Sequence, residues 1–303
     1  MSKYILGVDG GGTKTDVVIA DETGKVISTA SNGGANWERM GIAQALDSLE
    51  EVITKAATDA GINTSEISSA SFAIAGIDWP EDIKLYLPIP KRLGISKYEI
   101  MNDAFAALYA GSESLEGIVS IAGTGGKTAG IYRGKKVQSM GMELGEGGGA
   151  GQLVGLALEY IAMQFHNTAS ESALYELIPK AMGKKPGIEF FESVARNGVR
   201  LDESLAPLVF ELADKDDVGA LYAVKKTALQ HAKDVYGIAK QLGIENEEIN
   251  IVRAGGLHTA GNKAFDNEFE NYLRQNLPNA KSIVLATAPV MGAVLSALGA
   301  LNA

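Results

Sequence analysis

The 303-residue sequence contains no cysteine, and this absence removes several kinds of chemistry at once. Without thiols the chain cannot form disulfides, thiolate zinc sites or cysteine-held iron–sulfur clusters, and it has no cysteine nucleophile. No apolar run approaches the ~20 residues of a membrane span. The N-terminus has no cleavable apolar leader and begins with a strand-like pattern. The sequence therefore predicts a cytoplasmic globular protein without membrane segments.

Positive charge is also scarce, because 27 Lys and Arg face 37 Asp and Glu for a net charge of −10. No basic cluster offsets this balance, so nucleic acid is not an expected partner. Hydrophobic residues make up 46% of the chain, which is enough for a folded core. No Pro-, Ser- or Gly-rich linker divides the sequence. An anionic ligand would need a local site of backbone N–H groups, lysine and a metal ion.

Two segments about a hundred residues apart share one pattern. In residues 4–29 an apolar strand ends at Asp9 and three glycines, Lys14-Thr15 follows, and two more strands flank a turn with glycine. Residues 117–140 repeat this order around the glycine-rich stretch 123–126. A repeat of this length predicts a duplicated domain rather than a solenoid. Chance similarity between two glycine-turn hairpins is the alternative.

The rest of the chain alternates helical and strand-like apolar spacing, which indicates an α/β fold. Further strands are expected over 69–75, 98–101, 250–254 and 282–285. Helices are expected over 44–60, 83–93, 104–110, 152–165, 173–181, 190–196, 205–213, 220–242, 267–276 and 290–301. Pro88 and Pro90 are expected to break the end of the helix at 83–93.

The first glycine turn is the strongest local signal for function. Its three glycines exceed what a two-residue hairpin requires, and successive N–H groups in such a turn form an anion-binding concavity. Thr13 adds a hydroxyl donor and Lys14 a positive charge. Asp9, at the strand end, could hold a magnesium ion directly or through water. The alternative is an ordinary hairpin turn with a capping aspartate.

Two other glycine stretches imitate known motifs. Residues 123–128 end in GGKT, but a P-loop needs another glycine at Ile121 and a helix afterwards, and a strand-like segment follows instead. Residues 145–150 fit the dinucleotide pattern G-x-G-x-x-A without the preceding buried strand of a βαβ unit. This second stretch is nevertheless expected to open a helix, where glycine N–H groups can bind a ligand oxygen.

Asn102 and Asp103 end a strand and open a helix. Taken locally, they are best explained as a helix cap. The functional alternative is that Asp103 faces a ligand cleft as general base toward a substrate hydroxyl.

The ordered set of motifs resembles a known family. A first GVDGGGTKT, a central NDA, a GTGG, a glycine-rich GMELGEGGGAG and a late AGG are similar to those of the BadF/BadG/BcrA/BcrD-type ATPases and the N-acetylglucosamine kinases. Both belong to the actin-like sugar-kinase superfamily. The resemblance spans almost the whole chain and keeps motif order and spacing.

This resemblance implies two ribonuclease-H-like domains with ATP in a cleft between them. The expected domains are residues 1–104 with the C-terminal helix 290–303, and residues 105–289. The implied activity is phosphoryl transfer from ATP to a small sugar or sugar acid, with Asp103 as catalytic base and Asp9 as the acid linked to Mg²⁺. By motif position the ATP-binding residues are Gly11, Gly12, Thr13, Lys14, Thr124, Gly125, Gly126, Gly255 and Gly256. The substrate-binding residues are Asn36, Trp37, Gly76, Asp78, Asn102, Asp103 and Glu146.

The sequence departs from the family at two places. The G-T-G-S motif is GTGG here, followed by Lys127, and the G-D-E-G-S stretch of the amino-sugar kinases is GEGGG at 145–149. One acid and one serine that help to bind sugar hydroxyls are lost. With Lys127 and Arg39 close in sequence to these motifs, an acidic sugar such as 2-keto-3-deoxygluconate becomes an alternative to N-acetylglucosamine.

Other members of the superfamily provide rival interpretations. Activators of radical dehydratases hold an iron–sulfur cluster with cysteines, which this chain lacks. Sugar-responsive repressors carry a DNA-binding module ahead of the first phosphate loop, and here that loop lies within the first fifteen residues. A nucleotide-switched ATPase or activator without a small acceptor is the remaining alternative. A homodimer is expected from base rates only, since no interface is apparent in the sequence.

Overall fold

The computed structural model describes residues 3–196, 198 and 202–302. The chain folds into two compact units. Unit 1 comprises residues up to 119 together with 129–140 and 285 onward, and unit 2 comprises residues 120–128 and 141–284. The domain boundary expected at residue 104, like the ATP cleft, stays a prediction, and each unit is described by itself.

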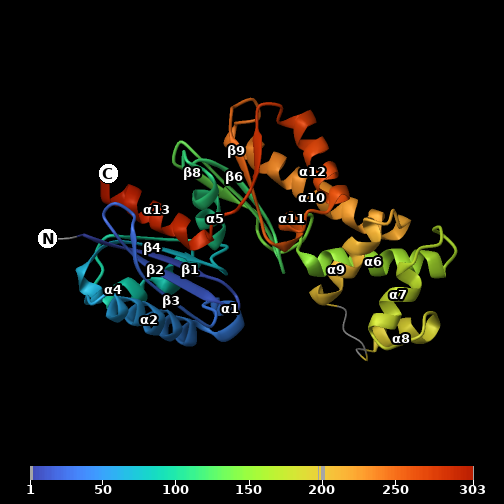
Figure 1. Cartoon of the computed structure of the whole chain (residues 1–303), viewed down its shortest axis with the longest axis horizontal. Coiled ribbons are helices and arrows are strands. Elements are labelled where there is room, and N and C mark those ends of the chain that lie inside the picture. Colours follow the sequence, from blue (N-terminus) through green and yellow to red (C-terminus); the bar gives the residue numbers. More distant parts are fainter. Residues whose placement is uncertain (1–2, 197, 199–201, 303) are drawn as a thin grey trace. The chain divides into compact units, whose positions relative to one another are not determined.

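The sheet of unit 1 has the strand order β3-β2-β1-β4-β5 (Figure 1). Its first three strands form the antiparallel meander expected from the sequence, and β4 and β5 extend it in parallel with β1. The strands are β1 (Tyr4–Gly10), β2 (Thr15–Asp21), β3 (Val26–Asn32), β4 (Ile67–Ile74) and β5 (Tyr98–Met101).

Helices cover both faces of this sheet because its strands alternate apolar side chains to either side. Leu6, Val8 and Ile19 pack in one core with the long helix α2 (Ile42–Asp59). On the opposite face Ile5 and Val18 pack against the C-terminal helix α13 (Pro289–Asn302). The close approach of α13 requires glycine at position 7, where a Cβ would lie 2.6 Å from Val294 Cγ2.

The helix expected over 83–93 is instead two short helices, α3 (Asp82–Tyr86) and α4 (Pro88–Leu93). Pro88 lacks an N–H group and cannot continue a helix, but it suits the first helical position, so α4 begins there. The remaining helices of unit 1 are α1 (Trp37–Met40), the 3₁₀ turn η1 (Thr64–Glu66) and α5 (Asp103–Gly111).

The second sheet has the order β10-β9-β6-β7-β8. If the five strands of each sheet are ranked along the chain, both sheets show the same spatial order, which supports duplication over chance similarity. The strands are β6 (Gly117–Ala122), β7 (Gly126–Tyr132), β8 (Lys135–Gln138), β9 (Asn250–Ala254) and β10 (Lys281–Val284). Lys127 lies in β7, so a strand rather than a P-loop helix follows this glycine turn, as expected.

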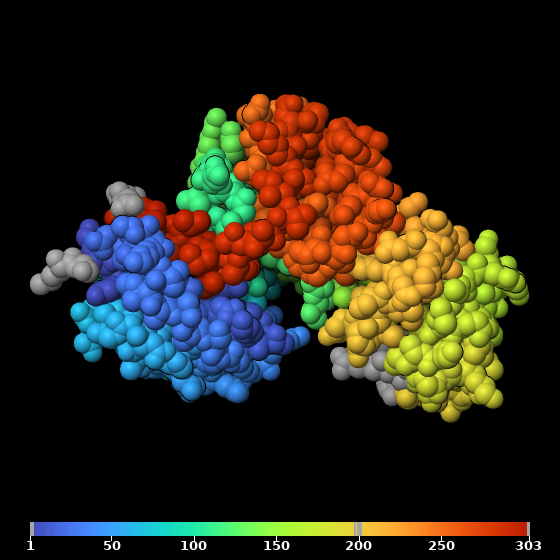
Figure 2. Space-filling model, in the orientation of Figure 1, coloured from blue at the N-terminus to red at the C-terminus, as the bar shows by residue number. Residues whose placement is uncertain are grey.

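Unit 2 is rich in helices, most of which the sequence predicts. The 25-residue helix α10 (Val218–Leu242) packs against α6, α9 and α12. Figures 1 and 2 show α6 to α8 gathered at one end of unit 2. The other helices are α6 (Ala150–Phe165), α7 (Leu174–Ala181), α8 (Ile188–Ala195), η2 (Glu203–Leu205), α9 (Ala206–Ala213), α11 (Gly256–Thr259) and α12 (Lys263–Asn276). Among the described residues, no helix has the length and apolarity to cross a membrane.

Candidate functional site

The carboxyl ends of three neighbouring parallel strands bring the predicted catalytic residues of unit 1 to one edge of its sheet. In the strand register Asp9 of β1 pairs with Ala73 of β4, and Ala73 pairs with Met101 of β5. The segments after these strand ends therefore emerge side by side. They carry the first glycine turn, Gly76 to Asp78, and Asn102-Asp103. In open α/β sheets this edge is where ligands bind.

Asn36, Trp37 and Gly76, expected to contact substrate, lie together. The Trp37 indole N–H donates a hydrogen bond of 2.8 Å to the Gly76 carbonyl. Gly76 has φ +83°, and a Cβ there would lie 2.6 Å from Asn36 Oδ1, so glycine is required. The buried Tyr86 hydroxyl donates to the Ala35 carbonyl (2.7 Å) and accepts from the Trp37 N–H (3.1 Å). Sequence reasoning missed Tyr86, whose distance from Trp37 in the chain hides the contact.

Asn102 is the cap of helix α5, and Asp103 is the first residue of that helix. The Asn102 side-chain oxygen accepts from the Ala104 N–H at 3.0 Å. Its amide group donates to the Ile77 carbonyl at 3.2 Å and to Asp78 Oδ1 at 3.3 Å. Asn102 therefore supplies the N-terminal cap of the helix. The carboxylate of Asp103 is not needed as the cap and stays a candidate for chemistry.

Asp9 sits in an electrostatically unfavourable place for a carboxylate. Burial and, after it, the neighbouring carboxylates of Asp103 and Asp16 together raise its pKa from 3.8 to about 7, against the smaller opposing effect of Lys14. A partly buried carboxylate that lies near other carboxylates favours a bound cation. Among the described residues no three His, Asp or Glu side chains converge on one point. Mg²⁺ commonly binds through one or two carboxylates, water and substrate phosphates, and Asp9 stays its predicted ligand.

The first glycine turn closes on itself and packs against the segment before α1. The Gly11 N–H donates to the Lys14 carbonyl at 2.8 Å, and the Ala35 N–H donates to the Gly11 carbonyl at 3.0 Å. A Cβ on Gly34 would lie 2.5 Å from the Gly12 carbonyl oxygen. The ammonium group of Lys14 forms an exposed ion pair with Asp16 at 2.8 Å.

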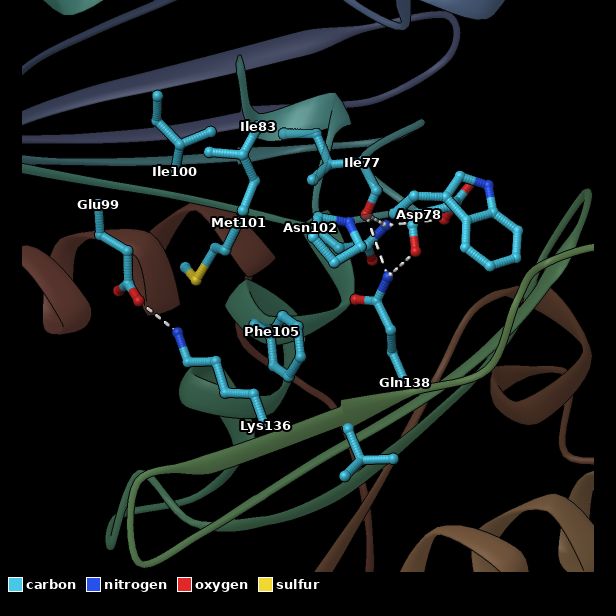
Figure 3. A pocket seen from close by; sticks show the side chains of 13 residues that line it. Ile77, Asp78, Ile83, Glu99, Ile100, Met101, Asn102, Phe105, Lys136 and Gln138 are labelled. Carbon is cyan, nitrogen blue, oxygen red and sulfur yellow. Dashed lines mark hydrogen bonds and ion pairs between the residues drawn. The ribbon is translucent and has the colours of Figure 1, made fainter. Parts of the chain in front are cut away.

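A pocket of ≈ 390 Å³ opens beside Asp78 and Asn102 (Figure 3). Its walls are largely apolar, with Met101 and Phe105 directed into it. Gln138 of β8 reaches across and donates to the Ile77 and Asp78 carbonyls at 3.1 and 2.9 Å. At the other end Lys136 pairs with Glu99. The Gln138 bonds fix the turn 77–78, on which the predicted substrate contact Asp78 lies.

In unit 2 the predicted second phosphate loop and the predicted adenosine loop are in contact. Gly255 has φ +88°, and a Cβ there would lie 2.5 Å from the Ala122 carbonyl oxygen and 2.7 Å from the Gly123 nitrogen. Only glycine permits this approach. Thr124, Gly125 and Gly256 are exposed at this junction.

A pocket of ≈ 720 Å³ in unit 2 is lined by Gly123 and Thr124 from one loop and Gly256 from the other. Apolar residues of α9 and α11, among them Phe210 and Leu257, form its wall. The remaining lining residues are Ala150, Glu203, Ala206, Pro207, Glu211, Asp214, Ala260 and Asn262. An apolar wall with carboxylate and amide acceptors is suited to a nucleoside, whose base packs on apolar side chains and whose ribose donates hydrogen bonds. No local pattern in the sequence indicates that α9 contributes to it.

The glycine-rich stretch at 145–149 departs from expectation, because side chains already occupy its N–H groups. Asp234, Gln152 and Glu143 accept from the N–H groups of Gly147, Gly148 and Gly149 at 2.5, 2.8 and 3.3 Å. The expectation of free donors at the start of α6 was therefore wrong. Glu146, the predicted substrate contact, accepts from the Met142 N–H at 3.0 Å.

Helix α10 holds the same stretch through one face. Gln230 donates to the Gly145 carbonyl at 2.9 Å, and His231 Nε2 donates to the Gly148 carbonyl at 2.8 Å. His231 Nδ1 is then the acceptor for Ser120 Oγ at 3.2 Å, and Ser120 in turn lies 3.1 Å from His258 Nε2. Burial lowers the pKa of His231 to about 4 and that of His258 well below its ordinary value, so both imidazoles are neutral.

The sequence is similar to one protein family and to two sugar kinases over almost its whole length. The sequence profile of the BadF/BadG/BcrA/BcrD ATPase family matches residues 6–297. The chain is 28% identical to an N-acetylmuramic acid/N-acetylglucosamine kinase from Clostridium acetobutylicum, over 97% of this chain and 98% of that protein. It is 27% identical to an N-acetyl-D-glucosamine kinase from Dictyostelium discoideum, over 98% and 99% of the two chains.

Solved structures show the same fold. A candidate N-acetylglucosamine kinase from Chromobacterium violaceum superposes with a TM-score of 0.71 at 22% identity, covering 97% of this chain and 98% of that one. The ROK hexokinase of Thermus thermophilus superposes with a TM-score of 0.60 at 16% identity, covering 99% and 100%. The two five-stranded sheets are thus those of the actin-like sugar kinases, as the sequence predicts.

Proposed function

The chain belongs to the BadF/BadG/BcrA/BcrD ATPase family, and we propose that this ATP-dependent carbohydrate kinase transfers the γ-phosphoryl group of ATP to a sugar hydroxyl with Asp103 as general base. The observation that carries the proposal is the register of β1, β4 and β5, which gathers the glycine turn, Asp9, Gly76 to Asp78 and Asp103 at one sheet edge.

In phosphoryl transfer the protein forms no covalent bond to the substrates and acts mainly by positioning them and by electrostatic stabilisation. The acceptor hydroxyl attacks the γ-phosphorus in line, the bond to the β-phosphate oxygen breaks, and ADP leaves. Asp103 receives the hydroxyl proton late, as bonding to phosphorus develops. Its place at the first turn of α5, next to the capping Asn102, fixes its backbone. When bound at Asp9, Mg²⁺ would supply charge neutralisation for the phosphates.

For the nucleotide, the pocket of unit 2 supports adenosine binding. It joins Gly123 and Thr124 of the proposed phosphate loop to Gly256 of the proposed adenosine loop. Asp214, whose Oδ1 accepts from Asn262 at 3.0 Å, keeps its other oxygen for further donors such as nucleoside hydroxyls.

For the acceptor, we favour a neutral N-acetylated amino sugar over a sugar acid. Both relatives that match almost the whole chain are by name kinases of N-acetylglucosamine, which is neutral, and one of them is also named for N-acetylmuramic acid, which carries a carboxylate. Lys127, one of the two cations that suggested an acidic substrate, is buried in β7 and already engaged in interactions. The other, Arg39, lies against the phosphate turn. A sugar acid remains the alternative acceptor in the test.

The test is Asp103→Asn, with Asp59→Asn as the matched control. Asp59 pairs with Lys55 on an exposed turn of α2. Loss of a general base typically costs 10²–10⁴-fold, so turnover of Asp103→Asn should fall to about that extent while ATP affinity, measured by calorimetry, is kept. Wild-type turnover in Asp103→Asn, with Asp59→Asn also normal, would remove Asp103 from the mechanism.

A further inference from the structure

Arg39 of the short helix α1 lies over the first glycine turn. A Cβ placed on Gly12 would lie 3.1 Å from Arg39 Nη1, 3.4 Å from Cζ and 3.5 Å from Cδ. The end of the arginine side chain thus lies beside the turn, while the residue as a whole is exposed. The missing side chain of Gly12 makes room for it.

The guanidinium group is uncommitted there. Within the described part of the chain, Arg39 is the one arginine whose side chain has no hydrogen bond, ion pair or aromatic ring contact. The others contact acidic, amide or aromatic side chains: Arg92, Arg133, Arg196, Arg253 and Arg274. The backbone N–H of Arg39 donates a hydrogen bond of 3.2 Å to the carbonyl of Asn36, which caps α1 three residues earlier. The anchored backbone and the unpaired head group leave the guanidinium group of Arg39 available for a ligand at the turn.

The turn beneath Arg39 also offers backbone donors. The Gly11 N–H donates to the Lys14 carbonyl. Within the described residues, the N–H groups of Gly12 and Thr13 donate no hydrogen bond. Lys14, the cation expected to charge this turn, is instead directed to Asp16. Because Lys14 is paired with Asp16, Arg39 is the unpaired cation beside the turn among the residues that the structure describes.

We propose that Arg39 is a catalytic residue that binds the phosphoryl group in transfer, together with the N–H groups of Gly12 and Thr13. This inference rests on the proposed kinase function and assigns Arg39 to the phosphate rather than to a sugar carboxylate. The guanidinium fork donates two N–H bonds to non-bridging phosphoryl oxygens and keeps all its protons. Its charge offsets the negative charge on those oxygens, which Asp9 and Asp103 would otherwise repel.

The kinetic test compares Arg39→Ala, Arg39→Lys and the control Arg92→Ala. Arg92 is likewise exposed on the same unit but pairs with Asp47 and Glu50. Removing a transition-state donor costs ~10²–10³-fold, so kcat of Arg39→Ala should fall by at least ~10²-fold with a nearly unchanged acceptor KM. Arg39→Lys should be intermediate, because an ammonium group cannot fork. Arg92→Ala should match the wild type.

The acceptors are N-acetylglucosamine, which is neutral, and N-acetylmuramic acid, which carries a carboxylate. The proposal requires the same kcat loss with every acceptor that is turned over. A rise in KM confined to the carboxylated sugar would overturn it and make Arg39 a determinant of acceptor choice.

A binding measurement needs no acceptor and separates this inference from the kinase function. Arg39→Ala should bind ADP as the wild type does but bind ADP with aluminium fluoride, a mimic of the phosphoryl group, at least about tenfold more weakly. Equal affinity for the mimic would overturn the role of Arg39. If the wild type formed no sugar phosphate with any acceptor, the proposed function itself would fail, whereas an active wild type with a normal Arg39→Ala variant rejects the role of Arg39 alone.

Discussion

Asp9, the proposed ligand of Mg²⁺, illustrates at the scale of one residue how a partly buried carboxylate near other carboxylates destabilises the protein that carries it. The folded-state pKa of about 7 lies well above the ordinary value of 3.8. The folded chain therefore keeps a proton at pH values where the unfolded chain has released it. The contribution of this proton to stability is complete below pH 3.8 and is lost as the pH rises through about 7.

The Asp9→Asn variant should accordingly be more stable than the wild type at pH 8, in the absence of metal, by on the order of 1–2 kcal/mol. The gain should be smaller at pH 5, where folded wild-type Asp9 is protonated. Phosphoryl transfer should be lost. Urea unfolding with EDTA at the two pH values measures this, and a stability difference that is independent of pH would contradict the assigned burial and repulsion.

At the scale of elements, contacts with each other and with helix α10 hold the two glycine-rich stretches of unit 2, residues 123–126 and 145–149, in position. The two stretches touch backbone to backbone: a Cβ on Gly126 would lie 1.9 Å from the Gly147 carbonyl oxygen, and one on Gly149 would lie 2.2 Å from that of Thr124. Gln230, His231 and Asp234 of α10 then fix residues 145–148 from behind. The position of the proposed phosphate loop thus depends on a helix that starts about ninety residues later.

Gly126→Ala should therefore destabilise the protein by about 1–3 kcal/mol and weaken ATP binding, because backbone atoms must move apart. Gly155→Ala is the matched control, since Gly155 occupies an exposed position of α6 with nothing within 4 Å of a Cβ. Alanine in that helix should stabilise by up to roughly 1 kcal/mol. Thermal unfolding and ATP titration of both variants measure this. A Gly126→Ala protein as stable as the wild type would show that the contact between the stretches is not required.

The elements also show what local sequence can and cannot predict. Strands that end in glycine turns were predictable, because apolar runs and glycine act within a few residues, and so was the cap at Asn102. The hold of α10 on residues 145–148 was not, because it depends on which face of a long helix meets a loop far away in the chain. For the same reason the N–H groups of Gly147 to Gly149 were expected to be free. Two of the three histidines lie in this network, so their scarcity was the available signal.

At the scale of the whole molecule, the chain repeats one sheet topology, and the two sheets carry different predicted site residues. The first sheet presents Asp9, Asp103 and the turn beneath Arg39 at the ends of parallel strands. The second carries the turn at 123–126 and, after β9, Gly255 and Gly256. The repeat was visible in the sequence through two glycine-turn hairpins. The last two strands of each sheet have no such signature, and only the structure shows that they add in the same order.

Acceptor-dependent formation of ADP tests the central claim most directly. Purified protein with Mg-ATP should release ADP slowly alone and much faster with one of a panel of hexoses, hexosamines, N-acetyl-hexosamines and keto-deoxy sugar acids. One sugar phosphate should form for each ADP, detected by mass spectrometry. ADP release at the same rate with and without every sugar, and no phosphorylated sugar, would contradict the kinase function and favour a nucleotide-switched ATPase.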